Sequence, residues 1–151
     1  MLLKTHLVIG LFGILVYSLF FEFNAVYALV FLIATLLPDI DSPKSWIGKS
    51  KMIRPLHWFV KHRGIFHSLT IGIIIAEIFV FLLGFGTGVA FFLGYGVHLL
   101  VDSFTVAGIR PLWPLNWFIR GRMKTGSRGE QNLFVLLLVV DAVLLTVLII
   151  G

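Results

Sequence analysis

Histidine and aspartate residues recur in several separate parts of this chain, and both residue types bind divalent metal ions. His98 and Asp102 are four residues apart, so they share one face of a helix. The chain has no cysteine, so any metal must be held by imidazole nitrogen and carboxylate oxygen. The candidate ligands are His6, Asp39, Asp41, His62, His67, His98 and Asp102.

A donor set of this kind predicts a divalent transition metal, with zinc or manganese the expected ion and iron an alternative. The candidates outnumber the four ligands of a tetrahedral zinc site, so two ions are reasonable. Two ions about 3.5–4 Å apart can hold both the attacking and the leaving oxygen of an ester. The expected chemistry is therefore hydrolysis, with a metal-bound water of lowered pKa as the nucleophile.

Other polar residues could complete such a reaction. Asp41 or Glu130 could act as general base, because a carboxylate can take a proton from water. Arg63 and Arg128, with Arg110 as a third candidate, could hold a phosphate, since guanidinium binds phosphate in a bidentate manner.

The composition indicates that lipid surrounds most of the chain. Of 151 residues, 59% are hydrophobic and 13% are charged, and a single small domain in water could not bury that much apolar surface. We therefore expect one transmembrane domain over residues 1–151, all-α, with about five transmembrane helices. The apolar runs are Leu7–Phe21, Ala25–Leu37, Ile65–Leu83, Val89–Val101 and Leu133–Ile150.

Three details of this assignment stay open. The run Ala25–Leu37 is a full span only if Asn24 and Pro38 lie in the headgroup zones, and is otherwise tilted or partly re-entrant. We expect Pro38 to end that helix by displacing the residue before it from the helical region. Apolar residues between Met52 and Val60 recur at helical spacing, which predicts a short amphipathic helix on the cytoplasmic face.

The basic residues predict the orientation in the membrane. With five spans, all 12 Lys and Arg fall on the side of the N-terminus and of the loops 39–64 and 103–132. Short basic loops stay in the cytoplasm, so we expect a multi-pass inner-membrane protein with these segments cytoplasmic. The positive charge then serves topology and contact with anionic lipids, not nucleic acid.

The same topology brings the candidate ligands to one depth at the cytoplasmic face. Ionisable groups at that depth are costly unless they are paired, hydrated or bound to a cation, and this supports a shared metal site. Glu77 and Asp141 lie in the middle of their runs. We expect them to hold helices together, although a transport path is the alternative.

Several short motifs are spread over nearly the whole chain, in the order Thr5-His6, residues 36–42 (LLPDIDS), residues 62–68 (HRGIFHS), residues 96–103 (GVHLLVDS), Gly108 and residues 125–130 (TGSxxE). Together and in this order, they resemble the YdjM-like family of inner-membrane metal-dependent hydrolases. Phe66 departs mildly from the family pattern, at a position that is not a candidate ligand. The resemblance implies a membrane-embedded, metal-dependent hydrolase and says little about its substrate.

The leading functional hypothesis is hydrolysis of a lipid or lipid-linked phosphoester at the cytoplasmic face, because a site at headgroup depth meets lipids first. Membrane lipids and a lipid or small-molecule substrate are the expected partners, and the sequence predicts no oligomeric state. One alternative is a divalent-metal transporter or channel that uses Glu77 and Asp141. Another is a non-enzymatic scaffold in which the metal is structural.

Overall fold

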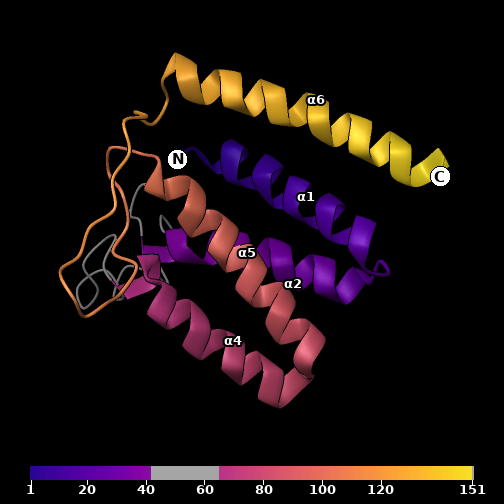
Figure 1. Cartoon of the computed structure of the whole chain (residues 1–151), viewed down its shortest axis with the longest axis horizontal. Coiled ribbons are helices and arrows are strands. Elements are labelled where there is room, and N and C mark those ends of the chain that lie inside the picture. The colour runs from indigo at the N-terminus through magenta and orange to yellow at the C-terminus, as the bar shows by residue number, and fades with distance from the viewer. Residues whose placement is uncertain (42–64, 151) are drawn as a thin grey trace.

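The protein is built from α-helices, as a computed structural model shows for residues 1–41 and 65–150 (Figure 1). Within these ranges there is no β-strand, and only two isolated β-bridges occur. The predicted all-α membrane fold is therefore confirmed, whereas the predicted surface helix between Met52 and Val60 lies outside the described residues. The helices are α1 (Leu3–Phe20), α2 (Ala25–Leu36), η1 (Leu37–Asp41), η2 (Ile65–His67), α4 (Leu69–Leu83), α5 (Phe85–Ser103) and α6 (Arg128–Ile150).

Three of these helices, α1, α5 and α6, are long and apolar enough to cross a bilayer. The other two apolar helices, α2 with its continuation to Ile40 and α4, are shorter. All five predicted apolar runs are thus helical. The second run was expected to be short, and its helix α2 is short. The helix of the third run, α4, is short as well.

The end of α2 differs in detail from the sequence prediction. The residue before Pro38, Leu37, keeps helical angles of φ −59° and ψ −41°, so the proline does not displace it from the helical region. Proline has no N–H to continue the α-helical ladder. The chain instead tightens into the 3-10 helix η1, which carries Asp39 onward from the end of α2.

The third helix begins later than its apolar run. Ser68 is extended and caps α4, because its hydroxyl accepts a hydrogen bond from the N–H of Thr70. The residues before it form the separate helix η2, which ends at His67. This break leaves His67 on a separate 3-10 turn ahead of α4.

The centre of the molecule is α5, which packs against both α2 and α4 (Figure 1). Its residues Phe91, Tyr95 and Leu99 are buried with Ala34 and Ala76 in one apolar core. Gly94 permits the contact with α2, since a Cβ there would lie 2.2 Å from the carbonyl oxygen of Phe31. On the other side, α1 packs against α2, α5 and α6.

One end of the bundle collects the starts of α1, α4 and α6 with the ends of α2 and α5 (Figure 1). The segment between α5 and α6 covers this end and is tied to it by backbone hydrogen bonds. Leu69 N–H donates to the carbonyl of Pro111 at 2.9 Å, and Arg110 N–H donates to the carbonyl of His67 at 3.3 Å. These bonds fix η2 and the first turn of α4.

Candidate metal centre

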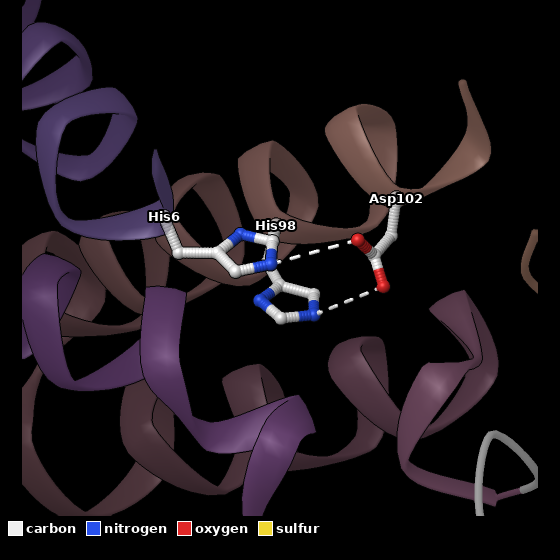
Figure 2. A group of neighbouring side chains, drawn as sticks. All are labelled: His6, His98 and Asp102. Carbon is white, nitrogen blue, oxygen red and sulfur yellow. Dashed lines mark ion pairs between the residues drawn. The ribbon is translucent and has the colours of Figure 1, made fainter. Parts of the chain in front are cut away.

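Three imidazoles converge on the carboxylate of Asp102, at the last turn of α5. His6 Nε2 lies 3.5 Å from Oδ1, while His67 Nε2 and His98 Nε2 lie 3.6 and 3.9 Å from Oδ2. All four side chains are fully buried. Figure 2 shows His6, from α1, and His98, from α5, both directed at the carboxylate of Asp102.

A second carboxylate, that of Asp39 in η1, lies near two of the same imidazoles. Its Oδ2 is 3.9 Å from His6 Nε2, and its Oδ1 is 3.8 Å from His67 Nε2. The side chain is only 15% exposed. Four segments that are remote in sequence therefore place three imidazoles and two carboxylates in one small volume.

These separations suit a shared cation better than direct hydrogen bonds, which fall mostly between 2.7 and 3.2 Å. Two ligand atoms bound to a tetrahedral zinc at 2.0–2.1 Å are roughly 3.4 Å apart. Two groups of donor atoms have all members within 4.8 Å of one another: His6, His98 and Asp102, and Asp39, His67 and His98. His98 belongs to both groups, and a neutral imidazole has one lone pair for a metal. One ion could therefore use His98, and a second ion would have to be held by the remaining donors.

The ring of His98 is held by helix α2. Its Nδ1 lies 2.7 Å from the backbone carbonyl oxygen of Thr35. A carbonyl can only accept, so Nδ1 carries the proton and Nε2 of the neutral ring keeps its lone pair. Such a second hydrogen bond is typical of metal-binding histidines, because it fixes both tautomer and ring orientation.

Several buried nitrogen atoms of the cluster lack hydrogen-bond partners. Neither ring nitrogen of His6 has one among the described residues, and neither does Nε2 of His98. The rings of His6 and His98 stack with centroids 4.1 Å apart. Leaving such atoms unsatisfied in a buried site costs free energy, and a bound cation would satisfy them. The residues present therefore fit a divalent metal.

The position of His67 depends on the loop after α5 and on Tyr95. The hydroxyl of Tyr95 donates to the carbonyl of Phe66, one residue before His67. The side chain of Ser68 also reaches the carbonyl of Pro111, at 3.4 Å. The ring of His67 meets that of His98 edge to face, with centroids 5.4 Å apart.

Glu130, a predicted general base, lies at the start of α6 and joins three parts of the chain. Its Oε1 accepts hydrogen bonds from Leu2 N–H at 2.6 Å and from the hydroxyl of Thr5 at 2.9 Å. Its Oε2 accepts from Gly126 N–H at 2.6 Å. Beside it, the amino group of Met1 lies 2.7 Å from Asp102 Oδ1. Glu130 thus fastens α1 and α6 next to the centre.

The other residues predicted to take part in the reaction differ in how far the structure describes them. Arg128 is exposed at the first position of α6. Arg110 belongs to the loop that holds His67, because its own N–H donates to the carbonyl of His67, and its guanidinium lies over the ring of Phe118. Asp41 is the last residue of η1, and the structure describes no side chain for it. His62 and Arg63 lie outside the described residues.

Glu77 and Asp141 belong to other parts of the molecule. Glu77 lies among apolar residues of α4 and α5, in a hollow of about 430 Å³. Asp141 is buried on α6, and its carboxylate has no hydrogen-bond partner among the described residues. Neither belongs to a group of potential metal ligands in the described part of the chain.

The sequence did not point to two residues that position the site. Thr35 acts through its backbone carbonyl, which every residue type has, so its identity gives no signal. Tyr95 looks like an ordinary core aromatic, and only the fold shows that its hydroxyl fixes the backbone before His67.

A bundle of apolar helices with a buried His–Asp cluster at one end defines a multi-helix membrane protein with a candidate metal centre. The chain belongs to the YdjM inner membrane protein family, whose sequence profile matches residues 1–150. It is similar to the inner membrane protein YdjM of Escherichia coli (strain K12) and to that of Shigella flexneri, each 34% identical over 108 residues.

The matched region covers 66% of this chain and 55% of each of these relatives, so the match spans about half of their length. No solved structure shows significant similarity to the chain. The comparisons thus give the family and an inner-membrane location for its named members, and the chemistry must be argued from the site.

Proposed function

We propose that this protein is a membrane-embedded, metal-dependent hydrolase that acts on a lipid or lipid-linked phosphoester. The observation that carries the proposal is the buried convergence of His6, Asp39, His67, His98 and Asp102 from four remote segments. Buried imidazoles and carboxylates are costly in a bilayer unless they are paired, hydrated or bound to a cation. The nitrogens of His6 and His98 that lack hydrogen-bond partners among the described residues favour a bound cation.

Zinc or manganese fits this donor set, with His6, His67 and His98 giving nitrogen and Asp39 and Asp102 giving oxygen. A divalent cation held by these residues would supply Lewis acidity, which could activate water and polarise a phosphoryl group. The protein keeps the donors in place, since the carbonyl of Thr35 orients His98 and the loop 105–112 holds His67.

Groups around the centre have separate tasks in this proposal. Arg110 and Arg128, with Arg63, bind the phosphate of the substrate, because guanidinium pairs with phosphate oxygens. Asp41 is the general base that receives a proton from water. Both oxygens of Glu130 already accept hydrogen bonds from α1 and from the turn before α6, so we assign Glu130 a positioning role.

The site would face the cytoplasm. All 12 Lys and Arg residues lie in the first turn of α1, in the first position of α6 or in the two long connections. Where the structure describes these segments, they lie at the end of the bundle that holds the cluster, and basic segments stay on the cytoplasmic side. A substrate there would be met at the depth of lipid headgroups.

The test is metal content together with lipid turnover, measured on one preparation of the purified full chain. We expect stoichiometric zinc or manganese, and release of phosphate or of a phosphorylated headgroup from vesicles of anionic and zwitterionic glycerophospholipids. His98→Ala should lose both. Glu77→Gln, which removes a carboxylate outside the cluster, is the matched control and should retain both.

A divalent-metal transporter would use the same ligands, and the experiment separates it. Proteoliposomes loaded with a zinc-sensitive dye report flux across the membrane. Flux that depends on Glu77 and Asp141, without lipid turnover in any vesicle, would replace hydrolysis by transport. Absence of metal from the wild-type protein, even after incubation with zinc and manganese, would remove both proposals.

A further inference from the structure

An apolar groove of about 370 Å³ runs beside the candidate metal centre, within the usual size range of ligand pockets. Residues of α1, α5 and α6 line it, together with Met1, Phe104 and Met123. Every lining side chain is apolar. The residues from these helices include Ile9, Phe12, Leu100, Val101, Leu133 and Leu137.

The groove and the metal centre share structural elements. On α5, Val97 and Val101 line the groove, and the next residues in sequence are His98 and Asp102. Met1 lines the groove as well, and its amino nitrogen lies 2.7 Å from the carboxylate of Asp102. Met1 therefore connects the groove to Asp102, one of the candidate ligands.

Positive charge lies next to one lining residue of the groove. Met123 lines the groove, and its N–H donates to the carbonyl of Phe104 at 3.1 Å. Its neighbours in sequence, Arg122 and Lys124, are both exposed. An apolar groove beside exposed basic residues is complementary to a hydrocarbon chain that carries an anionic head.

We propose that this groove binds one acyl chain of an anionic glycerophospholipid, with the phosphate held near Arg122 and Lys124. The inference rests on the proposed function and narrows it, because it names the substrate class as an anionic phospholipid of the surrounding bilayer. The metal centre then meets the headgroup ester of a lipid whose chain is already seated between α5 and α6.

The test is photo-crosslinking of the full chain, reconstituted in phosphatidylethanolamine vesicles that contain phosphatidylglycerol with a diazirine on its acyl chain. Mass spectrometry should find the label concentrated on peptides holding Leu100–Phe104 and Leu133–Leu137. Leu137→Trp fills the groove and should reduce this labelling roughly tenfold, because several methylenes lose their apolar contacts. Leu136→Trp, at a neighbouring residue that is 61% exposed and does not line the groove, should leave it unchanged.

A second comparison tests the headgroup. Unlabelled phosphatidylglycerol should compete with the probe better than phosphatidylcholine, and the double variant Arg122→Gln with Lys124→Gln should abolish that preference. Equal competition in the wild type, label spread evenly over the exposed face of α4, or crosslinks between two copies through the groove would each overturn the inference.

Metal content, measured on the same samples, keeps the two proposals apart. His98→Ala should lose its metal and still show groove labelling. Metal with unselective labelling would overturn the groove and leave the hydrolase, whereas selective labelling of a wild type that binds no metal would overturn the hydrolase and leave a lipid site.

Discussion

Asp102 is the residue on which the proposed centre depends most, because its two oxygens face His6, His67 and His98 at 3.5–3.9 Å. Asp102→Asn keeps the shape of the side chain and removes its charge. We expect metal affinity to fall by more than the roughly 10–100-fold that loss of an outer partner costs. Competition titration with a zinc chelator in detergent measures the change.

The matched control is Asp141→Asn, which alters a buried aspartate of α6 outside both ligand groups. Its metal affinity should equal that of the wild type. If Asp102→Asn binds zinc as tightly as the wild type, then Asp102 is not a ligand and the cluster is held together in some other way.

For single residues, the sequence predicted which side chains gather at the site better than it predicted how they are oriented. The spacing of His98 and Asp102 correctly implied one helix face, since both side chains are buried on the same side of α5. The hydrogen bond from His98 to the carbonyl of Thr35 could not be foreseen, because it depends on how α2 packs against α5.

At the scale of the helices, Glu130 joins the start of α1 to the start of α6, and its positioning role can be tested by substitution. Glu130→Gln replaces one acceptor oxygen by a donor, so at least one hydrogen bond from Leu2, Thr5 or Gly126 is lost. We expect a loss of about 1–3 kcal/mol in the free energy of unfolding. Thermal or denaturant unfolding in detergent, with metal absent, measures it.

Thr5→Val supplies a graded comparison, because it removes only the 2.9 Å hydrogen bond to Glu130. It should cost less than Glu130→Gln. Unchanged stability in Glu130→Gln, combined with complete loss of lipid turnover, would return Glu130 to the role of general base.

The contact between α2 and α5 gives a second test. A methyl group at Gly94 would meet the backbone of Phe31 at 2.2 Å, whereas one at Gly96 would meet nothing within 4 Å. Gly94→Ala should therefore destabilise the protein by about 1–3 kcal/mol through overpacking. Gly96→Ala, two residues along the same helix, should be neutral or stabilising, because alanine favours helix more than glycine.

Both variants are compared by unfolding in the same detergent. Equal stability of Gly94→Ala and Gly96→Ala would mean that α2 and α5 do not approach as closely as described. The separation of Thr35 from His98 would then be in doubt as well.

The helices themselves followed from the apolar runs, but their ends did not. The run from Ile65 could not reveal that Ser68 would start α4 and leave His67 on a separate 3-10 turn. A residue before proline usually avoids helical angles, but Leu37 keeps them because the chain continues from α2 into the 3-10 helix η1. Both exceptions carry candidate ligands, so local geometry at the site departs from local sequence preference.

For the whole molecule, a metal that binds only the folded state must stabilise it. At a free zinc concentration 100 times Kd, the free energy of unfolding should rise by about 2.7 kcal/mol. The melting temperature of the purified protein should therefore increase when zinc replaces EDTA. His98→Ala should show no such increase, and an equal shift in both proteins would indicate nonspecific binding.

The part of the site that the sequence could predict came from assuming that successive helices cross the bilayer in alternate directions. This assumption correctly implied that His6, Asp39, His67, His98 and Asp102 meet at one end of the bundle. It could not give the engagement of Glu130 with α1, because that contact depends on how α6 lies beside α1. His62 and Arg63 stay predictions.

X-ray absorption at the zinc edge, on the purified and zinc-loaded protein, tests the central claim most directly. The account predicts a saturable site with nitrogen and oxygen ligands at about 2.0–2.2 Å and the multiple-scattering pattern of at least two imidazoles. That pattern should weaken in His98→Ala. A spectrum of hydrated zinc without imidazole, or one unchanged by His98→Ala, would contradict it.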